Sequence, residues 1–219
     1  MAIVDKPWAR LALNIVGFIS NCYGFSVVGV FPPEIGFGGI FQFLTMIGLS
    51  VATLAFALKI LRFAVPGALE GFYRHIAYVA TPMEGLITLL YWPMVLYSRD
   101  LLADQEMPFE LPLTLDMALH FWPAVLLWID FLVFDAEFKR SKAHVLTIYV
   151  FTVIYLGWST YCFTRNGFWV YPFLAEFSTV GRMTFFMCCG NLCAGMYEAG
   201  AYIHSKLHVP KPNIKAKTQ

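Results

Sequence analysis

Six long apolar segments dominate the chain and leave little polar sequence between them. A helix of about 20 apolar residues crosses the roughly 30 Å hydrocarbon core of a bilayer, so each segment predicts one spanning helix. The segments cover about residues 10–31, 40–60, 75–97, 115–135, 144–164 and 179–204. The chain is 59% hydrophobic and 13% charged, whereas soluble domains are about a quarter charged. A bilayer is therefore the expected solvent, and the water-soluble enzyme classes are excluded.

The fold class that follows is an all-α membrane protein with six transmembrane helices in one bundle. No polar linker divides the sequence, so residues 1–219 are expected to form a single integral membrane domain. The first apolar run follows Lys6 and Arg10, is too long for a secretory signal and lacks a small-residue cleavage pattern. It is predicted to be a permanent span.

The basic residues give the orientation of these spans. Twelve of the 15 Lys and Arg residues precede the first segment, follow the sixth, or lie in the second-to-third and fourth-to-fifth connections. Positive charge marks the cytosolic side of a membrane protein, so both termini are predicted to be cytosolic. The opposite face carries only Arg99, Arg165 and Arg182. Trp169 and Tyr171 are expected to anchor that face in the headgroup layer.

Ionisable side chains at membrane depth are costly and mark candidate sites. They are Glu84, His120, Asp130 and Arg182. His120 lies about five residues inside the fourth segment, and Thr45 lies about five residues inside the second, counted from the same face. At 1.5 Å per residue both are roughly 7–8 Å below the membrane boundary. The sequence therefore predicts that Thr45 and His120 share a layer.

This layer could support nucleophilic catalysis. An imidazole can remove the proton that makes a threonine hydroxyl a poor nucleophile. Asp116 precedes His120 by one helical turn and could orient the ring as a third catalytic residue. Alternatively, Thr45 bonds a carbonyl of its own helix, or Glu84 and Asp130 form the proton path of a transporter.

The sequence gives little support for a metal, a cofactor or a nucleic acid as a ligand. One histidine and one aspartate are too few for a catalytic zinc site, so no metal and no cofactor are expected. A net charge of +1 without a basic aromatic patch gives no sign of nucleic-acid binding. The five cysteines lie in apolar segments without a paired spacing, which indicates buried thiols and not a disulfide framework.

Four ordered motifs resemble the androgen-induced-gene family of transmembrane threonine hydrolases. The first is the aromatic-Gly-Gly run that starts at Phe37 and ends at Phe43-Leu44-Thr45. The others are Tyr91-Trp92 with Arg99-Asp100, Leu115 to His120, and Gly167-x-Trp169-Val170-Tyr171-Pro172. They are similar in order and spacing to the family's motifs and cover nearly the whole chain. Asp116 and Met117 depart from the family, which often reads Asn-His at the corresponding positions.

The resemblance implies a six-span hydrolase of lipid metabolism that cleaves fatty acid esters of hydroxy fatty acids. It assigns the nucleophile to Thr45 and its partner to His120, and the expected partners are a lipid substrate and the bilayer. Arg182 could bind a substrate carboxylate or anchor the sixth span. A non-catalytic scaffold or accessory subunit that has kept the Thr–His layer is the alternative, favoured by the missing first histidine.

The chain ends in a Lys215-x-Lys217-x-x pattern. It resembles the dilysine retrieval signal of endoplasmic reticulum membrane proteins, which a cytosolic receptor reads as an address. The endoplasmic reticulum membrane is therefore the expected location. A solvated basic tail on a plasma membrane protein is the alternative.

Overall fold

The computed structural model describes residues 6–29, 35–102 and 111–208. Within these ranges all regular secondary structure is helical. The α-helices are α1 (Pro7–Gly24), α2 (Leu44–Ala64), α3 (Glu70–Tyr97), α4 (Leu113–His120), α5 (Trp122–Ile129), α6 (Lys142–Asn166) and α7 (Thr179–Leu207). Short 3₁₀ segments are η1 (Phe25–Gly29), η2 (Gly39–Gln42), η3 (Arg99–Leu101) and η5 (Pro172–Glu176), and η4 (Asp130–Phe134) is π-helical.

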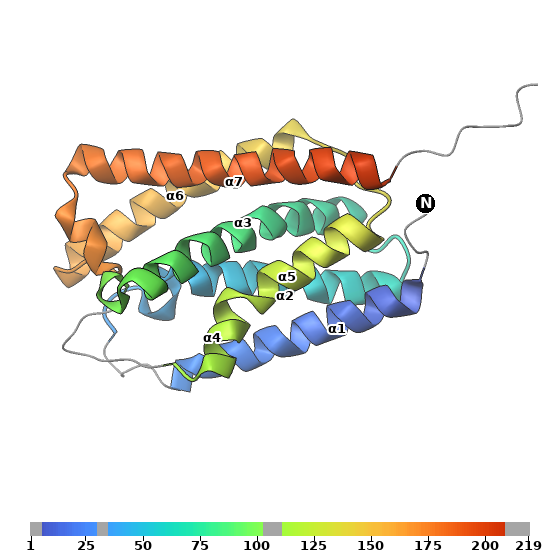
Figure 1. Ribbon diagram of the computed structural model, residues 1–219, viewed down its shortest axis with the longest axis horizontal. Helices are drawn as coiled ribbons and strands as arrows, with labels where there is room; N and C mark the ends of the chain where they lie inside the picture. Colours follow the sequence, from blue (N-terminus) through green and yellow to red (C-terminus); the bar gives the residue numbers. More distant parts are fainter. Residues whose placement is uncertain (1–5, 30–34, 103–110, 209–219) are drawn as a thin grey trace, which may run out of the picture.

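The helices lie lengthwise in one bundle around α3, which contacts α2, α5, α6 and α7 (Figure 1). Small residues such as Ala52, Ala77 and Ala80 let the central helices approach closely, and Phe56 and Leu127 fill the space between them. Figure 1 places the start of α1, the α2–α3 connection, the end of α5 with η4, and the end of α7 at one end of the bundle. The described basic segments therefore gather at that end.

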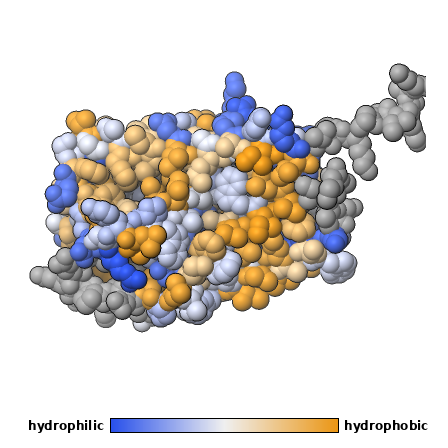
Figure 2. Space-filling view, viewed as in Figure 1, coloured by the Kyte–Doolittle hydropathy of each residue, from blue (hydrophilic) through white to orange (hydrophobic). Residues whose placement is uncertain are grey.

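Within residues 6–29, 35–102 and 111–208, four helices are long and apolar enough to cross a membrane, namely α1 extended by η1, α2, α3 and α6. The bent pair α4 and α5–η4 raises the number to five if it forms one span. Helix α7 is 29 residues long, but Asn191, Glu198 and several glycines lower its hydropathy below that of the others. Figure 2 shows apolar side chains over much of one face of the bundle, as expected of a surface in contact with lipid.

The second helix begins later than the sequence pattern predicts. The apolar segment was expected to be helical from about residue 40, whereas the chain makes the 3₁₀ segment η2 and an extended Phe43 before α2 starts at Leu44. Thr45 is therefore the second residue of its helix and not about the fifth, as the predicted start implies. His120 is the last residue of α4.

The fourth predicted span is broken beside Pro123. A proline ring lacks an N–H and collides with the carbonyl of the preceding turn, and α4 and α5 meet at an angle of 44°. The bend frees the carbonyl of His120, which accepts hydrogen bonds from Thr88 Oγ1 (2.7 Å) and Trp92 Nε1 (3.2 Å) of α3. Side chains of α3 thus supply the hydrogen bonds that the broken helix cannot give to this carbonyl, and they fix the backbone of His120.

A buried polar cluster closes the basic end of the bundle. Asp130 of η4 accepts from Arg10 (2.9 and 3.0 Å) and Asn14 (2.9 Å), and lies 2.9 Å from Lys59 Nζ. Asp130 and Lys59 are almost fully buried. The carboxylate therefore ties α1 and α2 to the end of the broken span, which identifies a structural role for Asp130.

Asp130→Ala is expected to lower the free energy of unfolding by about 3–5 kcal/mol, because it leaves buried Lys59 without its counterion. The matched control is Glu137→Ala, which removes an exposed carboxylate paired with Arg74 and should cost about 1 kcal/mol or less. Thermal unfolding in detergent measures both. Equal shifts of the midpoint in the two variants would contradict the structural role of Asp130.

Candidate active site

The turn before α2 is held in a conformation that requires glycine. Gly38 and Gly39 have φ angles of +91° and +52°, which L side chains rarely adopt. A Cβ atom on Gly38 would also lie 2.9 Å from Cys162 Sγ of α6. The double glycine therefore allows both the reversal of the chain and its close approach to α6.

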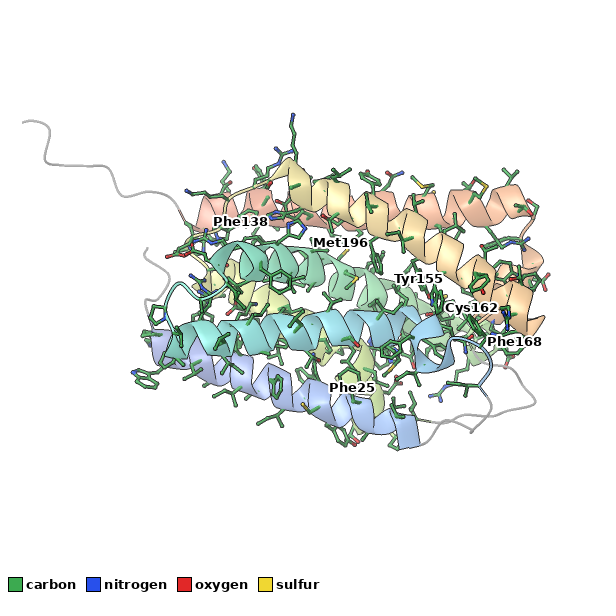
Figure 3. All side chains as sticks on the ribbon, turned by 180° about the vertical axis from the view of Figure 1, so that it is seen from behind. Phe25, Phe138, Tyr155, Cys162, Phe168 and Met196 are labelled. Atoms are coloured by element: carbon green, nitrogen blue, oxygen red, sulfur yellow. The ribbon has the colours of Figure 1, made fainter. Side chains whose placement is uncertain are left out.

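Side chains of α6 hold this turn in place. The side chain of Asn166 bonds both the N–H and the carbonyl of Phe37, Trp158 Nε1 donates to Phe41 O (2.8 Å), and Tyr155 Oη donates to Gln42 O (3.0 Å). Figure 3 labels Tyr155 and Cys162 on this part of α6. The start of α2 is therefore fixed from outside the helix.

The hydroxyl of Thr45 has no hydrogen bond with any residue that the structure describes. Ser50 and Thr53 of the same helix instead donate to the carbonyls of Met46 (2.7 Å) and Leu49 (2.6 Å), four residues earlier. Thr45 differs because it lies in the first turn of α2, where no helical turn precedes it. Its hydroxyl is therefore available to a ligand.

His120 is held by an acid and by an aromatic ring. Its Nδ1 lies 2.8 Å from Asp116 Oδ1 and 3.2 Å from Asp116 O, both of which are acceptors. The proton is therefore assigned to Nδ1, which leaves Nε2 as the basic nitrogen. The ring of Tyr91 stacks on the imidazole with centroids 3.4 Å apart, and Tyr91 Oη donates to Asp116 Oδ1 (2.6 Å). The three side chains form one unit in which half-buried Tyr91 positions buried Asp116 and His120.

Thr45 and His120 line the same cavity, which we call the outer cavity. Its wall also includes Tyr91, Arg99, Asp116 and Tyr171. The bundle thus brings together a free hydroxyl, an oriented imidazole and the acid that orients it.

A second cavity, the inner cavity, runs among α2, α3, α6 and α7. Its described lining is mostly apolar, includes Val79, Met83, Ile148, Phe151 and Phe186, and contains no Asp, Glu, Lys or Arg. Thr45, Tyr91, Leu102 and Tyr171 line both cavities. Thr45 therefore lies where an apolar cavity meets one that carries polar and charged groups.

The hydroxyl of Tyr171, a residue predicted to be a headgroup anchor, lies against the start of α2. Its hydroxyl accepts from Leu44 N (3.0 Å), and burial raises the pKa of the phenol. The phenol stays protonated at neutral pH and can donate that proton into the cavities. Trp169 is likewise buried, at 9% exposure.

The other predicted site residues, Arg182 and Glu84, line neither of the two cavities. The guanidinium of Arg182 donates to Leu174 O (3.0 Å) and Phe177 O and lies over the ring of Trp169. These contacts favour its role as an anchor of α7, and Arg182 lines neither cavity. Glu84 is buried beside Gly48 and also lines neither cavity.

Sequence reasoning missed Tyr91, Arg99 and Tyr171 as site residues. Each lies in one of the motifs that carry the family resemblance, which was the available signal. No group of three His, Cys, Asp or Glu side chains in the described part of the chain could hold a metal ion.

Comparison with known proteins supports the resemblance. The family model described as FAR-17a/AIG1-like protein matches residues 11–205. The chain belongs to the FAR-17a/AIG1-like family. This confirms the family predicted from the four motifs, and the matched range runs from α1 to the last turns of α7.

Relatives within the FAR-17a/AIG1-like family are distant. A UPF0641 membrane protein of Schizosaccharomyces pombe is 29% identical over 171 residues, which cover 77% of this chain and 76% of the relative. The human androgen-induced gene 1 protein is 20% identical over 221 residues, with coverage of 94% and 92%. The human androgen-dependent TFPI-regulating protein is 23% identical over 122 residues, with coverage of 56% and 53%. No solved structure matches the chain.

Proposed function

We propose that this protein is an intramembrane lipid esterase that hydrolyses fatty acid esters of hydroxy fatty acids. Thr45 is the nucleophile, His120 the general base, Asp116 the orienting acid, and Tyr91 the residue that positions both. The observation that carries the proposal is the position of Thr45. Its unbonded hydroxyl lines one cavity with the oriented His120 and another with apolar walls suited to an acyl chain.

The reaction follows from the protonation assigned to His120. Thr45 Oγ1 attacks the ester carbonyl carbon while Nε2 of His120 takes the hydroxyl proton. The tetrahedral intermediate collapses to an acyl-threonine, and His120 returns the proton to the leaving alkoxide as the alcohol forms. Water then attacks the acyl-threonine and gives a proton to His120. The second collapse releases the fatty acid and returns the proton to Thr45.

Two donors are suited to the oxyanion of these intermediates. The first N–H groups of a helix have no acceptor within it; that of Leu44 is bonded to Tyr171, and those of Met46 and Ile47 are bonded to Phe43 O. The Thr45 N–H has no backbone acceptor outside α2 among the described residues. This N–H and the Tyr171 hydroxyl, whose oxygen already accepts from Leu44, are left to stabilise developing negative charge.

The proposal includes six spans with both termini in the cytosol and the endoplasmic reticulum membrane as the location. The common end of the described basic segments supports this orientation, and α7 then forms the sixth span. The outer cavity lies toward the opposite, non-cytosolic end, where α3 ends and α4 begins. The dilysine pattern at residues 215–219 lies outside the described residues.

The experiment is hydrolysis of a palmitic acid ester of hydroxystearic acid by the purified protein in detergent. Release of palmitic acid and hydroxystearic acid in equal amounts is the expected result, with His75→Gln protein as active as wild type, because His75 lies near the basic end and bonds Thr147. A non-catalytic scaffold would bind the ester and release neither product. That outcome in well-folded protein would overturn the proposal.

A further inference from the structure

We propose that Arg99 binds an anionic group on the alcohol-derived half of the ester and so sets the direction in which the substrate binds. This inference rests on the proposed esterase function for its choice of ligand. It places the acyl chain in the inner cavity, the ester carbonyl at Thr45, and a carboxylate at Arg99.

The charged residues that line the two cavities indicate where an anionic ligand can bind. Among the residues that the structure describes, Arg99 is the only Lys or Arg that lines either cavity. It begins η3, one residue beyond the end of α3, and is exposed at the end of the bundle. Its guanidinium has no hydrogen bond or ion pair with any other described residue. An exposed cation at the edge of a cavity can bind an anionic ligand.

The inner cavity favours an uncharged part of the substrate. No Asp, Glu, Lys or Arg in the described part of the chain lines it, and a carboxylate placed among these side chains would lose its hydration without gaining a counterion. An uncharged acyl chain loses nothing on entering the same space. A lipid with one charged end therefore binds with that end toward the outer cavity.

Asp116 limits where the carboxylate of a substrate can lie within the outer cavity. Its carboxylate bonds His120 and Tyr91 and would repel a second carboxylate on its own side. Arg99 is the lining residue whose charge offsets that repulsion. Because Arg99 is exposed, the bound carboxylate can stay at the membrane–water boundary, where an amphiphilic lipid keeps its charged end.

The test uses the Thr45→Ala protein, which is expected to bind the ester without cleaving it. Binding of the palmitic acid ester of hydroxystearic acid is compared with binding of its methyl ester, which has no charge. The free acid should bind about 10-fold more tightly than the methyl ester, in the range expected of a charge-assisted hydrogen bond in partial contact with water. Adding Arg99→Gln should remove that difference and leave the affinity for the methyl ester within about twofold.

Arg165→Gln is the matched control, because Arg165 is an exposed arginine at the same end that lines neither cavity. It should keep the preference for the free acid. The inference is overturned if Arg99→Gln keeps that preference, or if it weakens binding of both esters equally. Hydrolysis by wild-type protein tests the proposed esterase separately. If the wild type does not cleave the ester but its binding depends on Arg99, the esterase proposal is wrong and the carboxylate site is still supported.

Discussion

Thr45→Ala protein is expected to hydrolyse the hydroxy fatty acid ester about 10⁴-fold more slowly than wild type, or not measurably. The substitution removes the oxygen that forms the acyl intermediate, and no other described hydroxyl both lacks a partner and lines a cavity with His120. Loss of a nucleophile typically costs this much or more, because the remaining groups of a catalytic unit cannot act without it. Initial rates of fatty acid release measure the effect.

Two variants show whether that loss reflects chemistry. Thr45→Ser keeps the hydroxyl and should keep a measurable share of the rate. Ser50→Ala removes a hydroxyl of the same helix that bonds its own turn, and it should hydrolyse at the wild-type rate. If Thr45→Ala protein with an unchanged unfolding midpoint kept the wild-type rate, Thr45 would not be the nucleophile.

His120→Gln protein is expected to lose about 10²–10⁴-fold in rate, the usual contribution of general acid–base catalysis. Glutamine preserves a polar side chain beside Asp116 but cannot take the proton of Thr45. Binding of the uncleaved ester should change little, because the rate is lost in the chemical step. Rates and affinities measured on the same preparation separate the two effects.

The double variant Thr45→Ala/His120→Gln tests whether the two residues act together. Residues that act as one unit have strongly non-additive effects. Thr45→Ala with His120→Gln should therefore be no slower than Thr45→Ala alone. A further drop by the full factor of His120→Gln would show that the histidine acts independently of Thr45.

The sequence predicted the helices well because their lengths and apolar composition are local properties. The third and fifth segments agree with α3 and α6 within a few residues at each end. Family motifs also led to Thr45 and His120, which line the same cavity. The late start of α2 was missed, because the 3₁₀ segment after Gly38 has the same apolar composition as the helix that follows.

The contacts that give the site its chemistry depend on tertiary packing. Nothing in the spacing of Tyr91 and His120 indicates that their rings stack, since the contact follows from the approach of α3 to α4 beside the Pro123 bend. Tyr171 has the amphipathic ring of a headgroup anchor, yet its hydroxyl lies at the start of α2. Arg99 and Arg182 look alike in sequence, and only the structure separates the arginine beside the cavity from the one bonded to carbonyls.

The central claim is that Thr45 carries the acyl group during turnover. An activated ester such as p-nitrophenyl palmitate should acylate the enzyme faster than water removes the acyl group, so the intermediate accumulates as a burst. Protein quenched with acid during the burst is digested and its peptides are analysed by mass spectrometry. One palmitoyl group on the peptide that contains Thr45, absent from Thr45→Ala protein, is the predicted result. A burst of the same size in Thr45→Ala protein, or a palmitoyl group on another residue of the active enzyme, would contradict the account.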